Sequence, residues 1–236
     1  MKSIFKKIPI VGPVIQKAYH LVRPNRPFPG SESYWKRRYR SGGNSGDGSY
    51  NQLAEFKAEV INGWVCLNGI GSVIEFGCGD GNQLALATYP KYMVLDVSPE
   101  AIALCKKKFH ADRSKVFGLV TDYAGQQADL ALSLDVIFHL VEDMVFESYM
   151  ARLFDASRRL VIIYSSNTDN NPVDQAPHVR HRKFSDWVDE NRADWHMIKY
   201  IPNRFPFTGN TKTGSLSDFF IYSRTPTTDK TAAQTA

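Results

Sequence analysis

Residues 73–84 of the chain read VIEFGCGDGNQL, a short apolar run that leads into three glycines at alternate positions. A buried strand, a tight turn and the start of a helix are predicted from this order of residues. Gly77, Gly79 and Gly81 can adopt backbone angles that are closed to other residues, and they let a ligand approach the main chain closely. The pattern G-x-G-x-G differs from the G-x-G-x-x-G of a dinucleotide-binding turn, and an acid, Glu75, stands two residues before it.

This motif resembles the first motif of the class I S-adenosylmethionine-dependent methyltransferases, in which an acid and one further residue precede G-x-G-x-G. Residues 94–100, VLDVSPE, resemble the strand end and helix start that follow it in the same class. The resemblance implies that Glu75 and the three glycines belong to a binding site for S-adenosylmethionine. It also implies that Asp96, fifteen residues beyond Gly81, accepts hydrogen bonds from both ribose hydroxyls, because a carboxylate offers two acceptors to a vicinal diol. Val97 belongs to the same part of the predicted cofactor site.

Strands that alternate with helices continue on both sides of this motif. Further strands are expected at 92–96, 116–120, 128–135 and 160–166, and helices at 51–68, 84–89, 99–108 and 185–191, with residues 136–141 turning into a further helix. Residues 195–201 and 218–222 resemble the closing antiparallel strands of the fold. These elements predict an α/β protein, with a doubly wound, mostly parallel seven-stranded sheet and helices on both faces. Its ligand crevice lies beyond the carboxyl ends of the strands, where Gly79, Asp96, Asp122 and Asp135 all fall.

Asp122 and Tyr123 stand at the end of the third predicted strand. Their position matches the one that borders the adenine in the class, which adds both residues to the predicted cofactor site. A cap or turn role is the alternative for Asp122.

The composition is that of one domain with appended segments. The chain has 236 residues, of which 43% are hydrophobic, and this is enough for a full core. No stretch has the length that spans a bilayer, and no signal peptide with a small-residue cleavage site is recognised. Three cysteines without metal-binding spacing indicate reduced thiols and a cytoplasmic protein. We expect an N-terminal arm at 1–30, a helical lid or cap at 31–69, a methyltransferase domain at 70–224 and a disordered tail at 225–236.

Basic residues are concentrated at the front of the chain. Residues 1–40 hold ten Lys and Arg against one Glu, a net charge of +9, so the remainder of the +5 chain carries about −4. Apolar residues are mixed with lysines over residues 1–26, and Pro9 and Pro13 prevent one continuous helix. Two interpretations stay open: a segment that rests on the anionic inner surface of the membrane, or an arm that packs on its own domain or a partner chain.

Residues 33–50 combine an aromatic and cationic helical segment with a loop rich in Gly and Ser. Many methyltransferases of the class have a similar segment ahead of the first motif, and it closes over the cofactor. By that resemblance Tyr34, Arg38 and the loop 42–48 form a lid, in which Arg38 meets the methionine carboxylate. The alternative is a solvated linker.

Methyl transfer from a sulfonium is an in-line displacement, and a hydroxyl acceptor must also lose a proton. The candidate base is His139, within LDVIFHL at residues 134–140, because an imidazole titrates near the working pH. Several sugar and small-molecule O-methyltransferases have a histidine at the corresponding place, and the alternative is a partly buried helix residue. Asp135, at the end of the fourth strand, is the second candidate catalytic residue.

A metal-dependent mechanism is the less favoured alternative. Asp135, with Asp169 and Asn170 after the fifth strand, resembles the magnesium ligands of catechol-type O-methyltransferases. Residues 165–171 are rich in turn formers, so Asp169 and Asn170 also fit ordinary turn chemistry. The favoured prediction therefore contains no metal ligand.

Residues 177–184 read PHVRHRKF and form the expected acceptor-recognition element. Alternation along an extended segment places His178, Arg180 and Arg182 on one face, with His181 between them. Such a face suits phosphate, uronate or another anionic acceptor. A solvated charge run next to the acidic helix 186–190 is the alternative.

The sequence thus predicts transfer of a methyl group from S-adenosylmethionine to an oxygen of an anionic or sugar-containing small molecule or glycan, such as a cell-surface glycan or its lipid-linked precursor. Methylation of exocyclic base amines is disfavoured because no Asn-Pro-Pro-aromatic motif follows the fourth strand, and pyrimidine C5 chemistry is excluded because no Pro-Cys pair exists. A nucleic-acid partner is therefore not the favoured prediction. Two alternatives stay open: an RNA methyltransferase whose basic front binds phosphates, and a non-catalytic S-adenosylmethionine-binding subunit. The sequence does not specify the oligomeric state.

Overall fold

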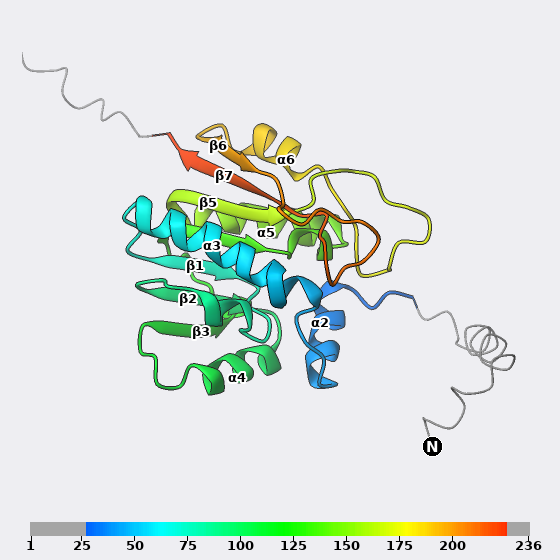
Figure 1. Cartoon of the computed structure of the whole chain (residues 1–236), viewed down its shortest axis with the longest axis horizontal. Coiled ribbons are helices and arrows are strands. Elements are labelled where there is room, and N and C mark those ends of the chain that lie inside the picture. Colours follow the sequence, from blue (N-terminus) through cyan, green and yellow to red (C-terminus); the bar gives the residue numbers. More distant parts are fainter. Residues whose placement is uncertain (1–26, 226–236) are drawn as a thin grey trace, which may run out of the picture.

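A computed structural model describes residues 27–225 of the chain. Within this part, seven strands form one sheet in the order β3-β2-β1-β4-β5-β7-β6 (Figure 1). They are β1 Val73–Phe76, β2 Tyr92–Asp96, β3 Lys115–Leu119, β4 Ala128–Leu134, β5 Ser157–Ser165, β6 Trp195–Ile201 and β7 Asp218–Arg224. The strands from β1 to β5 pair in parallel, whereas β7 runs antiparallel to β5 and β6. The predicted fold class is confirmed.

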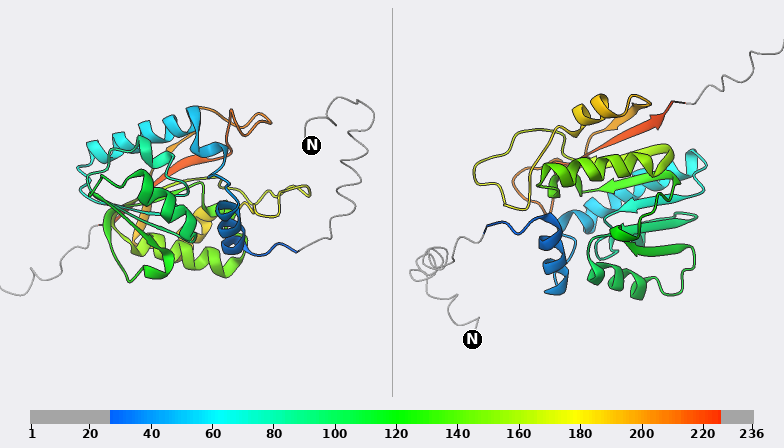
Figure 2. Two further views of the ribbon diagram at one scale, coloured as in Figure 1. Left: turned by 90° about the horizontal axis from the view of Figure 1, so that it is seen from below. Right: turned by 180° about the vertical axis from the view of Figure 1, so that it is seen from behind.

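Helices cover both faces of the sheet (Figure 2). α3 Asn51–Leu67 and α4 Pro99–Lys108 pack on one face, and α5 Asp143–Asp155 and α6 Phe184–Asn191 pack on the other. α2 Ser31–Arg40 stands beyond the carboxyl ends of the parallel strands (Figure 1). Short 3₁₀ turns connect these elements: η2 Asp47–Ser49, η3 Gln83–Leu86, η4 Val120–Asp122 and η5 Ile137–His139.

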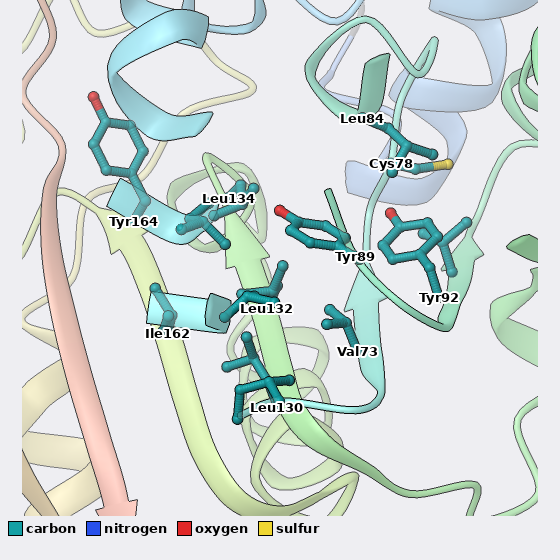
Figure 3. Close-up of a cluster of buried hydrophobic side chains, with 14 of the residues drawn as sticks. Val73, Cys78, Leu84, Tyr89, Tyr92, Leu130, Leu132, Leu134, Ile162 and Tyr164 are labelled. Carbon is teal, nitrogen blue, oxygen red and sulfur yellow. The ribbon is translucent and has the colours of Figure 1, made fainter. Parts of the chain in front are cut away.

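The sheet separates two apolar cores, because side chains alternate between the faces of a strand. Leu130, Leu132 and Ile162 are buried against α3 and α4 (Figure 3), and Ala131 and Val161 are buried against α5. Both faces of β4 and β5 are therefore apolar, as is typical of central parallel strands. In the register of β1, Glu75 stands opposite Val94 of β2 and Leu132 of β4, so the carboxyl ends of these three strands meet at one edge.

The predicted strand 92–96 and helix 99–108 match β2 and α4 residue for residue. Ser98 caps α4, since its hydroxyl oxygen accepts the N–H of Ala101, and Pro99 fits the first helical position. This start positions the end of β2, which carries Asp96.

Two predicted helices are wrong in extent. The helix expected at 84–89 is only the 3₁₀ turn η3, because Ala87 is already extended and Tyr89 precedes Pro90, which disfavours helical backbone. After β4, the residues expected to turn directly into a helix form only η5. The helix α5 begins later, because Glu142 has extended backbone.

The expected arm over residues 1–26 and the tail from residue 226 lie outside the described residues. The membrane-surface interpretation of the arm therefore stays a prediction from the sequence. Residues 27–30 lead into α2 without regular structure. Within the described part, no helix combines the length and the apolar character needed to cross a membrane.

Replacing Leu132 by alanine is expected to lower the free energy of unfolding by about 2–5 kcal/mol, because this fully buried side chain would leave a cavity against α3. Val116→Ala on β3 is the control, since Val116 is 54% exposed and its truncation should cost about 1 kcal/mol or less. Urea denaturation followed by circular dichroism measures both values. Equal destabilisation by the two substitutions would contradict the assignment of Leu132 to the core.

Candidate functional site

A cavity of about 530 Å³ lies at the carboxyl ends of β1, β2 and β4, beneath α2. This is where ligands bind in open α/β sheets. The sequence-predicted residues that line it are Glu75, Gly77, Gly79, Asp96, Val97, Asp135 and His139. The remaining predicted residues are not in its wall, namely Tyr34, Arg38, Gly81, Asp122, Tyr123, His178, Arg180, His181 and Arg182.

The glycine turn forms the floor of the cavity. Gly79 has a φ of +57°, and a Cβ at this position would lie 2.6 Å from the Tyr39 hydroxyl and would collide with the Ser45 hydroxyl. Gly77 has a φ of +100°, and a Cβ there would lie 2.7 Å from Val136. Both positions therefore require glycine, for backbone conformation and for space.

Asp96 ties the end of β2 to this turn. Its carboxylate accepts the N–H of Gly79 at 3.1 Å and the N–H of Ser98 at 2.8 Å. Burial raises the pKa of Asp96 to about 6, although these N–H groups favour the charged form. The Cys78 thiol also lies 4.0 Å from Oδ2, whereas Oδ1 accepts the Ser98 N–H at 2.8 Å and can still accept a hydrogen bond from a diol in the cavity.

Glu75 is a second buried carboxyl group in the cavity wall. It accepts a hydrogen bond from the Tyr92 hydroxyl at 2.5 Å. Burial raises the pKa of Glu75 to about 7, and this hydrogen bond and the nearby charge of Lys57 oppose the shift. Two buried carboxyl groups favour a ligand that carries positive charge or hydroxyl donors.

The segment between α2 and α3 covers the glycine turn. The N–H of Ser45 donates to the Asp80 carboxylate at 3.0 Å, and the Ser45 hydroxyl accepts the N–H of Asp80 at 2.9 Å. The Tyr50 hydroxyl donates to the same carboxylate at 2.6 Å. Tyr39 also lies over the turn, with its hydroxyl 3.1 Å from that of Ser45. The segment is thus fastened directly to the cavity floor.

Arg38 and Tyr34, which were predicted to bind the cofactor, contact protein groups and do not line the cavity. Arg38 donates to the main-chain oxygen of Asn44 at 2.6 Å, and its guanidinium lies 5.5 Å from the ring centroid of Trp35. The Tyr34 ring stacks on His178 with 4.3 Å between centroids. Contact of Arg38 with a methionine carboxylate stays a prediction, and this arrangement does not favour it.

Asp135 is paired with a lysine that the sequence analysis missed. Its backbone is left-handed, with a φ of +56°, which is uncommon for a residue other than glycine. Its carboxylate accepts hydrogen bonds from the Lys57 ammonium at 2.7 Å and the Ser217 hydroxyl at 2.8 Å. Lys57 is 1% exposed. A signal was present, because Leu53, Lys57 and Ile61 recur every fourth residue and so share one helix face.

The residues of the alternative metal site do not come together. Asp169 accepts the N–H of Lys183 in an exposed loop, and Asn170 donates its N–H to the Thr168 hydroxyl. Asp135 is occupied as described above. Within residues 27–225, no three His, Cys, Asp or Glu side chains form a group that could hold a metal ion.

His139 lines the cavity from η5. Its Nδ1 lies 3.0 Å from the main-chain oxygen of His178. A carbonyl oxygen only accepts, so Nδ1 carries the hydrogen and Nε2 keeps its lone pair. Burial lowers the pKa of His139 to about 4, and the charge of Arg38 acts in the same direction. The imidazole is therefore neutral at pH 7, and the edge of Trp35 packs against it at 4.8 Å between centroids.

The arginines of the segment 177–184 hold the turn that carries His139. Arg182 is 8% exposed, donates to the main-chain oxygens of Leu140 and Val141 and pairs with Asp143. Arg180 contacts the same Val141 oxygen and the same carboxylate. Both guanidinium groups are thus engaged by protein atoms.

Residues 177 and 178 form a turn and residues 179–183 have no regular secondary structure, and Arg180 and Arg182 lie on one side of the segment, since both contact Val141 and Asp143. His181 is buried, and its Nδ1 lies 2.6 Å from the Ser166 hydroxyl oxygen. His178 is the one member of the cluster that stacks beside His139, with 5.5 Å between ring centroids. His178 therefore brings this segment into contact with His139.

Val120, in the turn after β3, lines the cavity, whereas the predicted Asp122 and Tyr123 do not. The Asp122 carboxylate accepts the N–H of Leu119 at 2.8 Å, which fits the alternative cap role. Tyr123 packs against Phe76, with the Arg152 guanidinium 5.9 Å from its ring centroid. Arg152 itself lines the cavity.

Comparison with known proteins identifies the central part of the chain. Residues 74–162 match a family described as a methyltransferase domain. No curated protein sequence matches significantly.

Many solved structures share the fold. The N-methyltransferase NodS from Bradyrhizobium japonicum WM9, solved with S-adenosyl-L-homocysteine, is 13% identical with a TM-score of 0.60, covering 84% of this chain and 99% of that one. Magnesium protoporphyrin IX methyltransferase from Synechocystis PCC 6803 is 15% identical with a TM-score of 0.59, covering 82% of this chain and 98% of that one. An S-adenosylmethionine-dependent methyltransferase from Clostridium acetobutylicum ATCC 824 is 13% identical with a TM-score of 0.54, covering 72% of this chain and 91% of that one.

The chain is an S-adenosylmethionine-dependent methyltransferase with a Rossmann-like fold, and S-adenosylmethionine is its cofactor. The residues of the cavity fit this cofactor. Asp96 offers acceptors for a ribose diol, the glycine turn has no side chains that would block a nucleoside, and Glu75 favours positive charge. The buried amide oxygen of Gln83, also in the wall, has no hydrogen-bond partner among the described residues and can accept a hydrogen bond from a ligand.

Binding of S-adenosylhomocysteine is expected to weaken as the pH falls through 6. The pKa of Asp96 is about 6 in the free protein, and hydroxyl donors of the ribose favour the charged carboxylate. The contribution of Asp96 to the affinity should therefore be constant above this pH and fall by up to about tenfold per pH unit below it, whereas a dependence near pH 7 would come from Glu75. Calorimetric titration between pH 5 and 8 measures this dependence.

Two variants separate the carboxyl groups in this titration. Glu75→Gln should keep the dependence around pH 6, because Asp96 is still present. Asp96→Asn should bind S-adenosylhomocysteine more weakly and should lose the dependence around pH 6. A dissociation constant that is equally flat with pH in the wild type and in Asp96→Asn would argue against Asp96 as the ribose ligand.

Proposed function

We propose that this methyltransferase transfers the methyl group to a hydroxyl oxygen, with His139 as the general base, on an acceptor that is anionic or contains a sugar. The observation that carries the proposal is the tautomer of His139. The carbonyl of His178 fixes the hydrogen on Nδ1, which leaves the lone pair of Nε2 free in a residue that lines the cavity. A free lone pair at neutral pH is what a base needs to take a hydroxyl proton.

The cofactor supplies an electrophilic methyl group on a sulfonium sulfur. His139 would accept the proton of the acceptor hydroxyl as the oxygen attacks this methyl group, so that an alkoxide need not form in advance. Trp35 and the His178 carbonyl hold the imidazole from two directions, which fixes the orientation of Nε2. Arg182 holds the main chain at Leu140, directly after the base.

The surroundings of His139 support an anionic acceptor. Its pKa is low, and the charge of Arg38 is one of the causes. An anionic group next to Arg38 and His178 would offset this charge and raise the pKa of His139 toward the working pH, where a general base is most effective. His178 is half-buried and stacked on Tyr34, so it can contact such a group without leaving its place.

Within the expected cap 31–69, residues 31–50 would act as a lid over cofactor and acceptor, whereas α3 packs on the sheet as part of the core. The start of α2 is fastened to the start of α5, because the N–H of Ser31 donates to Glu142 at 2.9 Å and the Ser31 hydroxyl to the same carboxylate at 2.5 Å. The end of the segment is fastened to Asp80. Opening at these hydrogen bonds would admit the cofactor, and closing them would exclude water from the reaction.

His139→Ala is expected to lower kcat by about 10²–10⁴-fold, because the hydroxyl proton then has no acceptor. The dissociation constant of S-adenosylhomocysteine should not change, since the base contacts the acceptor. His196→Ala is the matched control, because His196 is exposed on β6 and should leave the rate unchanged. Unchanged activity of His139→Ala would remove the base from this proposal.

The acceptor class is tested by incubating the protein with methyl-labelled cofactor and fractionated cell extract. Label in an anionic glycan, sugar or small-molecule fraction is expected, and alkaline and enzymatic digestion would locate it on oxygen. Label confined to RNA would contradict the proposed acceptor class. An absence of label in every fraction, with the cofactor bound, would favour the non-catalytic alternative.

A further inference from the structure

Three polar side chains from distant parts of the chain meet in one wall of the cavity. Lys57 comes from α3, Gln83 from η3 and Asp135 from the end of β4. Lys57 is 1% and Gln83 9% exposed, and the Asp135 side chain is 17% exposed. None of the three has a role in the methyl-acceptor chemistry proposed above for His139.

Burial of the Lys57–Asp135 ion pair costs hydration free energy that is offset when the pair binds a ligand. The Lys57 ammonium lies 2.7 Å from the Asp135 carboxylate and 5.2 Å from the ring centroid of Tyr164. A buried pair of this kind often contributes no more stability than apolar side chains of the same volume, because both ions lose their hydration. Lys57 also occupies the apolar face of α3, where Leu53 and Ile61 flank it. The fold alone does not call for a lysine here.

The side-chain oxygen of Gln83 is a hydrogen-bond acceptor without a donor among the described residues. Its side-chain nitrogen donates to the main-chain oxygen of Ala54 at 3.0 Å, which fixes the orientation of the amide. Its Oε1 is buried and has no partner within residues 27–225. An unsatisfied buried acceptor is unfavourable, so this oxygen is suited to a donor that arrives with a ligand.

The amino-acid end of S-adenosylmethionine carries an ammonium and a carboxylate on one carbon, and both must find partners when buried. Among residues 27–225, the cationic side chains in the cavity wall are Lys57 and Arg152. Arg152 lies over Tyr123 beside the end of β3, whereas Lys57 lies on the side of the glycine turn, near enough to Glu75 to affect its charge. Arg38 is not in the wall. Lys57 is therefore the cation available to a carboxylate above the turn.

We propose that Lys57, Asp135 and Gln83 form the receptor for the amino-acid end of the cofactor. Lys57 would bind the carboxylate, and Asp135 and the orphaned Oε1 of Gln83 would bind the ammonium. The Lys57–Asp135 ion pair is thereby complementary to the opposite charges of the ligand, and each buried charge gains a second partner of opposite sign. This inference concerns the cofactor alone, so it stands or falls separately from the role of His139.

Two nucleosides test the proposal by calorimetry with the full-length protein. S-adenosylhomocysteine has the amino-acid end, and 5′-methylthioadenosine lacks it but keeps the adenosine and the sulfur. Lys57→Met should weaken the binding of S-adenosylhomocysteine by about 30-fold or more, as expected for the loss of one partner of a buried charge pair. The affinity for 5′-methylthioadenosine should be unchanged, and binding of this ligand also shows that the variant is folded.

Further variants complete the test. Gln83→Met should weaken S-adenosylhomocysteine by about 3–10-fold and leave 5′-methylthioadenosine unchanged. Asp96→Asn is the matched control, which should weaken both ligands alike because both contain the ribose. If Lys57→Met binds neither ligand, the double variant Lys57→Met/Asp135→Asn, which leaves no unpaired buried carboxylate, replaces it. Equal changes for both ligands in the lysine and glutamine variants, or no change for either, would overturn the proposal.

Discussion

The hydrogen bond from the Gly79 N–H to the Asp96 carboxylate, 3.1 Å long, is the constraint on which the site depends. It joins the turn after β1 to the end of β2, and the two strands lie side by side because Phe76 pairs with Leu95 in the parallel register. The carboxylate remains buried because backbone N–H groups offset part of the cost of removing it from water. One interaction therefore fixes both the floor of the cavity and the side chain that we expect to bind the ribose.

The other buried polar groups around the cavity are also held by hydrogen bonds or ion pairs to protein groups. Glu75 has the Tyr92 hydroxyl, Asp135 has Lys57, and His139 has the His178 carbonyl. These partners give each group one protonation or orientation in a place that water reaches poorly. The partners come from β2, from α3 and from the loop that follows β5, so the site is assembled only when the core of β4 and β5 is packed. Stability of the core and function of the site are thus linked through β4, which ends at Asp135.

The sequence predicted the parts of the molecule whose signals are local. Strand β2 and helix α4 have clear periodicity and a Ser-Pro start, and the glycine turn and Asp96 follow from strand ends that topology places together. The partners of Asp135 could not be found in this way, because Lys57 and Ser217 stand 78 and 82 residues away along the chain. Charge alternation at Arg180 and Arg182 equally allows contact with a ligand, with solvent or with the protein itself. Only the folded chain shows that Asp143 and main-chain oxygens take both guanidinium groups.

A crystal structure of the protein with S-adenosylhomocysteine tests the central claim most directly. Both ribose hydroxyls are expected within hydrogen-bond distance of the Asp96 carboxylate, with the Gly79 N–H still bound to it and the sugar above the glycine turn. A nucleoside bound outside this cavity, or a ribose held by other side chains while Asp96 keeps only its backbone partners, would contradict the account.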